Sequence, residues 1–163
     1  MSDAGLSDKG IIVSKQRITT TKFRIIGNNV QMLRVDEEMD NSLNDDEKQY
    51  FEDKISELFD NVSPDVVIFQ DYNKGTLCPT IINNIIKRAI KDEIPIVADP
   101  KLKNFYSFQN ITLFKPNLKE LKEGLKYYDE NFSIDTHSNL ILEFQKKQKI
   151  DMLLLTLSEK GVF

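Results

Sequence analysis

The chain has 163 residues, 29% of them charged and 40% hydrophobic, with a formal net charge of -4 and a pI near 5.1. This length and composition predict one soluble globular domain with a buried core. The acidic balance argues against a nucleic-acid-binding module, which usually has a basic face. No apolar run is long enough to span a bilayer, so no membrane partner is expected. The single cysteine, Cys78, excludes an intrachain disulfide and favours a reducing, cytoplasmic compartment.

The first part of the chain predicts a loop followed by a β-hairpin. Residues 1–17 are expected to form a loop or a short strand. Over residues 18–36, Phe23 and Ile25 are separated by a charged residue, and Gly27-Asn28-Asn29 supplies residues that tolerate positive φ in a turn. Because many of its side chains are polar, this hairpin is expected to project from the domain as an arm or lid.

From residue 44 to residue 163 the sequence alternates helical and strand patterns. Helices are expected from Asn44, where a capping-box pattern begins, from near Pro79, over 117–126 and over 135–149. Short apolar strands are expected at 65–70, 94–98, 111–114 and 151–156. Strands that alternate with helices indicate βαβ units, and hence an α/β fold with a mostly parallel sheet.

All four expected strands end in polar residues, which gathers candidate ligand-binding groups at one edge of the sheet. In open α/β sheets the ligand crevice lies outside the carboxyl ends of the strands. The residues that this topology brings to that rim are Asp71, Asp99, Lys101, Asn117, Glu120, Thr156 and Ser158. The sequence has no Walker A loop and no G-x-G-x-x-G, which weighs against P-loop NTPases and dinucleotide-binding enzymes.

The spacing of Asn117 and Glu120 has two interpretations. An Asn at the N-cap and a Glu three residues later form a capping box, in which each side chain bonds a backbone N–H of the other residue. A Glu in the first turn of a rim helix can also hold a hydrated Mg²⁺, which prefers oxygen ligands. The spacing alone favours the cap.

Three further rim segments also have two interpretations each. Hydroxyl and backbone groups of Thr156-Leu-Ser-Glu-Lys-Gly161 can donate to phosphate oxygens, or the segment is an ordinary strand exit with Gly161 at positive φ. Lys101, in Asp99-Pro100-Lys101, could neutralise a transferring phosphoryl group, or it belongs to a solvated turn. The same choice applies to Asp71 and Lys74.

Taken in order, these pieces resemble the ribokinase-like (PfkB) sugar kinases, and most of all their heptose-7-phosphate kinase branch of ADP-heptose synthesis. The matching stretches are TTTKFRIIGNNVQMLRVDEE, DVVIFQDYNKG, IPIVADPKLKNFYSFQNITLFKPNLKEL and LLLTLSEKGV. The resemblance implies a doubly wound α/β fold, a mostly parallel sheet and a β-hairpin lid that closes over the sugar and often pairs between subunits. It also implies ATP and Mg²⁺ as cofactors and a sugar phosphate as substrate.

The resemblance assigns roles to residues of this chain. Asn117 and Glu120 would position Mg²⁺ and phosphate, and Lys101 would lie near the phosphates. The nucleotide side would include Asn117, Thr156, Ser158 and Gly161. The substrate side would include Lys22, Arg34, Asp71, Lys74 and Asp99.

One departure from the family pattern limits these expectations. The family's catalytic Asp lies in a Gly-Ala-Gly-Asp motif, and these 163 residues contain no such motif. We therefore expect an incomplete domain: 1–17 loop, 18–36 lid and 44–163 partial kinase domain, inactive alone, with a second copy through the lid or the missing remainder of the kinase as partner. Two alternatives stay open: another ribokinase-like kinase of ribose or fructose type, and a non-catalytic nucleotide-binding or assembly module.

Overall fold

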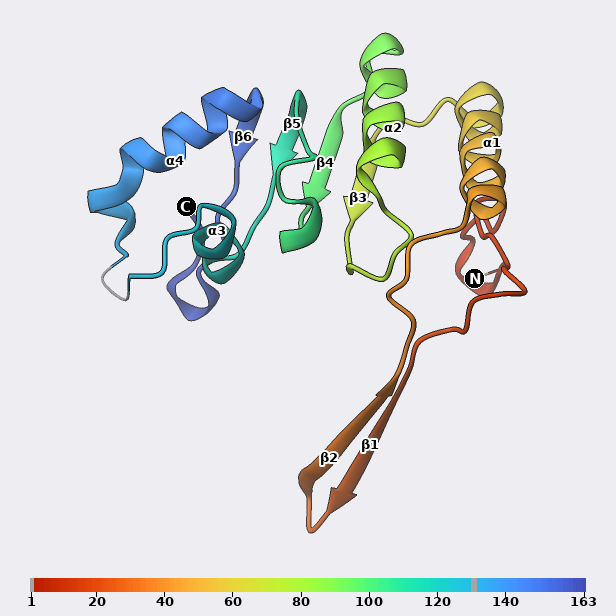
Figure 1. Ribbon diagram of the computed structural model, residues 1–163, viewed down its shortest axis with the longest axis horizontal. Helices are drawn as coiled ribbons and strands as arrows, with labels where there is room; N and C mark the ends of the chain where they lie inside the picture. Colours follow the sequence, from red (N-terminus) through yellow and green to blue (C-terminus); the bar gives the residue numbers. More distant parts are fainter. Residues whose placement is uncertain (1, 130–131) are drawn as a thin grey trace.

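A four-stranded parallel sheet forms the centre of the computed structural model, which describes residues 2–129 and 132–163 (Figure 1). The strands are β3 (Val67–Gln70), β4 (Ile96–Asp99), β5 (Ile111–Phe114) and β6 (Ile150–Leu153), and they lie in this order. All neighbouring pairs are parallel. The predicted α/β fold with a parallel sheet is confirmed, and each strand reaches the next through a crossover, as parallel pairing requires.

Four α-helices accompany the sheet in the described part of the chain: α1 (Asp45–Val62), α2 (Pro79–Lys91), α3 (Leu118–Gly124) and α4 (Ile134–Gln148). Local sequence sets their ends. Asn44 and Glu47 form a complete capping box at the start of α1, and Pro79 occupies the first turn of α2. Lys149 ends α4 in the left-handed conformation, with φ of 53°. Within the described ranges, no helix is both long and apolar enough to cross a membrane.

The hairpin consists of β1 (Thr21–Gly27) and β2 (Val30–Glu37), which pair antiparallel and project from the body of the molecule (Figure 1). Its turn residues Asn28 and Asn29 have φ of 51° and 59°, which fits the left-handed turns of two-residue hairpins. The segment before it holds a short 3₁₀ helix at Ser2–Ala4 and otherwise forms a loop.

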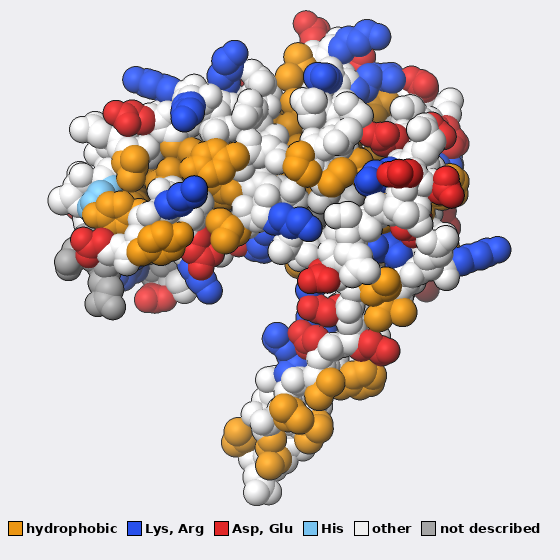
Figure 2. All heavy atoms as spheres, in the orientation of Figure 1, with side chains coloured by type: hydrophobic (Ala, Val, Ile, Leu, Met, Phe, Trp, Pro, Cys, Tyr) orange, Lys and Arg blue, Asp and Glu red, His pale blue; other side chains and the backbone are white. Residues whose placement is uncertain are grey.

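The two faces of the hairpin differ in chemistry. Because side chains alternate along a strand, cross-strand pairs lie alternately on either face. The pairs Phe23–Val35 and Ile25–Leu33 form an apolar face, whereas the pairs Lys22–Asp36 and Arg24–Arg34 form a charged face. All four apolar side chains are about half exposed, and Figure 2 shows hydrophobic side chains along the projecting arm.

Aromatic packing holds the rim end of the molecule together. The rings of Phe105 and Phe114 meet edge to face with centroids 5.1 Å apart, and Phe144 of α4 packs against both. Gly124, at the end of α3, lies against the Phe105 ring, and a Cβ there would come within 2.4 Å of it. This close approach fixes α3 beside the strand ends, and so positions the first turn of α3 at the rim.

Candidate functional site

The site is built at the carboxyl ends of the parallel strands. Asp71 follows β3, Asp99 ends β4, Asn117 follows β5, and Thr156 follows β6. Backbone hydrogen bonds join adjacent strand exits: Asp71 N donates to Asp99 O at 3.1 Å, and Leu118 N donates to Thr156 O at 3.2 Å. The expected gathering of these residues along one edge of the sheet is therefore what the structure shows.

Glu120 and Asn117 form a complete capping box at the start of α3. Asn117 Oδ1 accepts from Glu120 N, and Glu120 Oε2 accepts from Asn117 N, each at 2.9 Å. The second carboxylate oxygen, Glu120 Oε1, accepts from Nζ of Lys101. The Glu120 residue is only 8% exposed. The cap is thus present, and the carboxylate also binds a cation at the rim, so capping does not exclude a second role.

The protonation of Lys101 follows from its acidic surroundings. Partial burial by itself would lower the pKa of Lys101, because desolvation disfavours the charged form. The hydrogen bond to Glu120 and the charges of Glu120, Asp99 and Asp71 outweigh that effect and raise the pKa above its ordinary value. Lys101 is therefore positively charged at neutral pH, and its ammonium group is paired with the Glu120 carboxylate.

The rim offers few oxygen ligands to a metal ion. Among the described residues, no group of three or more His, Cys, Asp or Glu side chains could hold one. Mg²⁺ in phosphoryl-transfer sites is typically held by one or two carboxylates together with substrate phosphates and water. Glu120 is the rim carboxylate available for such an arrangement, and a metal ion bound to its Oε1 would have to replace or share the contact with Nζ of Lys101.

A hollow of about 690 Å³ lies beside the start of α3. Its lining includes all four residues expected on the nucleotide side: Asn117, Thr156, Ser158 and Gly161. Ser158 and Gly161 have positive φ, 58° and 87°, at the two ends of the 3₁₀ turn Ser158–Lys160. The strand-to-turn exit expected from the sequence is therefore present. Its residues line an open hollow and are not packed into the hydrophobic core.

Asp71 is held by a residue that the sequence analysis did not single out. Its Oδ2 accepts from Nδ2 of Asn104 at 2.9 Å, and its Oδ1 accepts from the backbone of Asn73 at 2.7 Å. Asp71 is 2% exposed and Asn104 is 1% exposed. Thirty-three residues separate the pair along the chain, so no local pattern could have pointed to Asn104. Asp71 thus joins two rim loops.

Asp99 is paired rather than free. Its Oδ2 accepts from Nε2 of Gln70 at 3.1 Å and lies 3.0 Å from Nζ of Lys115. Lys115 is the first residue after β5 and was not among the expected site residues. The sequence could have pointed to Lys115 in the same way as to Asp99, because both are polar residues at the end of a strand.

The substrate-side lysines and arginine cluster at the base of the hairpin. Lys22 Nζ lies 2.8 Å from Asp36 Oδ2, and Arg34 Nε lies 3.0 Å from Asp36 Oδ1. Lys74, in the loop after β3, pairs with Glu38, which also lies 3.7 Å from Lys22. The hairpin is thereby tied to the rim loop through a network of opposite charges.

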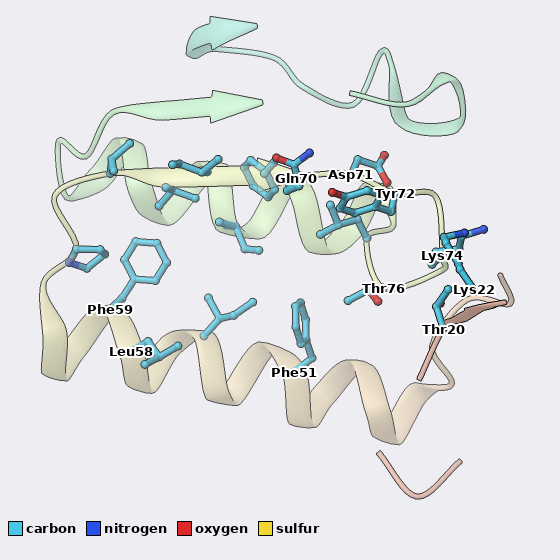
Figure 3. Close-up of a pocket in the computed structure, with 18 residues that line it drawn as sticks. Thr20, Lys22, Phe51, Leu58, Phe59, Gln70, Asp71, Tyr72, Lys74 and Thr76 are labelled. Atoms are coloured by element: carbon cyan, nitrogen blue, oxygen red, sulfur yellow. The ribbon is translucent and has the colours of Figure 1, made fainter. Parts of the chain in front are cut away.

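The expected site residues do not share one pocket. Lys22, Asp71 and Lys74 border one end of a groove of about 830 Å³ between α1 and β3 (Figure 3). The nucleotide-side residues line the hollow beside α3, and the Lys101–Glu120 pair lies along the rim without lining either space. Arg34 is on the hairpin and lines neither space.

Comparison with known proteins gives sequence relatives and fold neighbours. No protein-family model matches the chain. The chain is 37% identical over 161 residues to the bifunctional protein HldE of Helicobacter pylori J99, covering 97% of this chain and 33% of that protein. It is 33% identical over 169 residues to the bifunctional protein HldE of Wolinella succinogenes, covering 99% of this chain and 33% of that protein. The chain therefore spans about a third of these relatives.

Solved structures of phosphofructokinase-2 from Escherichia coli share the fold. The complex with fructose-6-phosphate aligns with a TM-score of 0.59 and 20% identity, over 80% of this chain and 43% of that one. The tetrameric inhibited form aligns with a TM-score of 0.58 and 19% identity, over 80% of this chain and 42% of that one. These matches agree with the predicted α/β fold, whose parallel sheet and antiparallel hairpin the structure of this chain contains.

Proposed function

We propose that the chain belongs to the ribokinase-like (PfkB) carbohydrate kinases and is the central part of an ATP- and Mg²⁺-dependent sugar kinase. Its likeness to a third of the bifunctional HldE proteins and its shared fold with phosphofructokinase-2 support this proposal. The proposed substrate is heptose 7-phosphate, phosphorylated at its anomeric hydroxyl by the γ-phosphoryl group of ATP. The proposed parts are a lid over 18–36 and a partial kinase domain over 44–163. The proposed setting is the cytoplasm.

One observation carries this proposal: four nucleotide-side residues from two strand exits surround the hollow beside α3, next to a buried Glu that binds a rim lysine. Backbone and hydroxyl groups of Thr156, Ser158 and Gly161 would donate to the ATP phosphates. Lys101 would offset negative charge on the transferring group. On the other side, Lys22, Arg34 and Lys74 would contact the sugar phosphate together with Asp71 and Asp99.

Asn117 and Glu120 would hold the metal ion, which supplies charge neutralisation between phosphate oxygens when bound. Catalysis of this kind consists mainly of positioning and electrostatic stabilisation. The base for the sugar hydroxyl is proposed to lie outside these 163 residues, since they contain no Gly-Ala-Gly-Asp motif. We therefore expect nucleotide binding by this chain without transfer to the sugar.

The first prediction tests Glu120 as metal ligand against Glu120 as cap. A Gln at the third position of a capping box also bonds the N-cap backbone, so Glu120→Gln keeps the cap and removes the charge. We expect wild-type chain to bind Mg·ATP in calorimetric titration, and Glu120→Gln to unfold in urea within about 1 kcal/mol of wild type while losing the dependence of ATP affinity on Mg²⁺.

Glu123→Gln is the matched control, because Glu123 lies on the same helix and its nearest cation, Lys119, is 3.8 Å away. It should leave both measurements unchanged. If the ATP affinity of Glu120→Gln still depends on Mg²⁺ as it does in wild type, Glu120 caps the helix and does not bind the metal ion. Absence of ATP binding by the wild-type chain would contradict the nucleotide site, and phosphorylation of heptose 7-phosphate by the chain alone would contradict the external base.

A non-catalytic nucleotide-binding or assembly module is the second candidate function. The observation that favours it is the same missing motif, combined with a hollow that is lined by all four residues expected on the nucleotide side. Full-length relatives distinguish the two candidates: if adding the remaining kinase portion to this chain restores transfer, the chain is a catalytic part. Ribose and fructose 6-phosphate in the same assay test the alternative sugars.

A further inference from the structure

The rim cation Lys101 extends from a short turn that follows β4. A 3₁₀ helix, Leu102–Asn104, comes directly after Lys101, and Asn104 N donates to Lys101 O at 3.1 Å to close the turn. The two residues between them, Leu102 and Lys103, are exposed, so they do not anchor the turn in the core. The anchoring of Asn104 therefore decides where the backbone of Lys101 lies.

The side chain of Asn104 is anchored on the neighbouring strand exit. Its Nδ2 donates to Asp71 Oδ2 at 2.9 Å and to Leu77 O at 3.2 Å. Both acceptors lie between β3 and α2, so one amide group ties the turn after β4 to the segment after β3. Asp71 and Asn104 are buried, and a hydrogen bond to a carboxylate is stronger where water is excluded.

The same segment is fixed to α3 on its other side. Phe105 is fully buried and lies against Gly124, and the hydroxyl of Tyr106 donates to Gly124 O at 2.8 Å. These contacts hold the turn beside the helix that carries Glu120. Lys101 and Glu120 therefore meet because one short segment is attached to both the β3 exit and α3.

An amide is an unusual choice for so buried a position. Among the described residues, Asn104 Oδ1 accepts no hydrogen bond although it is buried. A buried polar atom without a partner destabilises a fold, and an apolar side chain of the same size avoids that penalty. The amide is therefore explained by the two bonds that its Nδ2 donates, and not by the filling of the core.

We propose that Asn104 is a positioning residue, whose bonds to the segment after β3 hold Lys101 against Glu120, in place for the transferring phosphoryl group of ATP. The inference rests on the proposed function, since Lys101 meets that group only if the chain binds ATP. It also connects the two sides of the site, because Asp71 of the substrate side fixes the cation of the nucleotide side through Asn104.

The first measurement is made on the chain without nucleotide. In wild type, nuclear Overhauser contacts should join the side-chain methylenes of Lys101 and Glu120, because Lys101 Nζ donates to Glu120 Oε1. Asn104→Ala removes the amide and leaves space for water beside Asp71, so the carboxylate can stay solvated while the turn is released. We expect the contacts between Lys101 and Glu120 to disappear in this variant.

Asn84→Ala is the matched control. Asn84 also donates its amide to a carboxylate, Glu52 Oε1, at 2.8 Å, but this bond joins α1 to α2. The control should keep the contacts between Lys101 and Glu120. Asn104→Leu is a second variant, which removes the same donor and keeps the volume of the side chain, and it decides the question if Asn104→Ala does not fold.

Calorimetric titration with Mg·ATP and Mg·ADP separates positioning from a general loosening of the fold. ADP lacks the transferring phosphoryl group, so Asn104→Ala should weaken ATP binding about fivefold and ADP binding less than about twofold. Lys101→Met should show the same selectivity. The double variant should bind ATP no more weakly than Lys101→Met, because effects that act through one group are not additive.

Three results would overturn the inference: Lys101–Glu120 contacts that persist in Asn104→Ala, equal losses of ATP and ADP affinity, or a double variant that is weaker than Lys101→Met. A failure of the proposed function looks different, because the wild-type chain would then bind no ATP. The contacts between Lys101 and Glu120 in the free chain would still decide whether Asn104 positions the lysine.

Discussion

At the residue scale, the Glu120 side chain takes part in a helix cap and in an ion pair at the same time. Its two carboxylate oxygens have different partners: one closes the capping box with Asn117, and the other accepts from Lys101. The cap fixes the side chain in one orientation, and that orientation presents the second oxygen to the rim. The choice between a cap and a metal ligand was therefore never exclusive.

The second prediction concerns Lys101 and pH. Lys101→Met leaves the Glu120 carboxylate without its cation and should lower the free energy of unfolding by about 1 kcal/mol at pH 7, since Lys101 is partly exposed. The raised pKa of Lys101 means that the folded state holds its proton more tightly than the unfolded state. Its contribution is therefore complete below the ordinary lysine value of 10.5 and is lost as pH rises through the higher folded value.

Urea unfolding of wild type and Lys101→Met over this pH range measures the effect. The difference in free energy should be constant at neutral pH and vanish in strong base. Lys103→Met, on an exposed neighbour, should behave as wild type throughout. A difference that persists unchanged in strong base would show that packing of the aliphatic stem, and not the charge, stabilises the fold.

At the scale of elements, the loop after β3 is fixed against the segment that follows the hairpin. Arg17 donates to Asn41 O at 2.9 Å and to Lys74 O at 2.6 Å, and Leu43 N donates to Gly75 O at 3.3 Å. Gly75 has φ of 82°, and a Cβ there would overlap Asn41 O at 1.8 Å. Backbone therefore meets backbone at this point, and only glycine allows it.

The third prediction is that Gly75→Ala lowers the free energy of unfolding by at least about 2 kcal/mol, because it combines left-handed strain with a backbone clash. Gly161→Ala is the control: its φ is also positive, at 87°, but no atom lies within 4 Å of the added Cβ. It should lose about 1 kcal/mol from strain alone. Equal losses in urea unfolding would mean that the Asn41 contact relaxes freely.

At the scale of the whole molecule, the open apolar surfaces of the described residues include the groove beside β3 and the apolar face of the hairpin. The hairpin stands clear of the body, so its own domain does not cover that face (Figure 1). A projecting strand pair with one apolar face is suited to packing on a second copy of itself, which is the homodimer expected from the family resemblance. Dimerisation through the lid stays a prediction.

The fourth prediction tests that dimer. Ile25→Lys puts a charge on the apolar hairpin face and should raise the dissociation constant of self-association at least tenfold in sedimentation velocity. Gln31→Lys places the same charge on the opposite face and should leave it unchanged. If Ile25→Lys leaves self-association unchanged, copies meet at another surface and the lid is not the interface.

The sequence by itself determined the order and type of the main elements, because capping boxes, turn residues and hydrophobic periodicity act within a few residues. Asn44 and Asn117 started their helices where expected, and Asn28-Asn29 made the turn. It also placed the candidate residues along the rim, since parallel strands separated by crossovers must all end at the same edge.

Only the tertiary structure decided which of those residues meet. The pairing of Asp71 with Asn104, of Asp99 with Lys115 and of Lys101 with Glu120 depends on how strand exits pack side by side. The tertiary structure also decided that β3, at one edge of the sheet, faces an open groove. The sequence Val-Ile-Phe is equally consistent with a covered strand and with an uncovered one, so it could not predict this. Local rules act on neighbours in the chain, whereas these contacts join residues brought together only by the sheet.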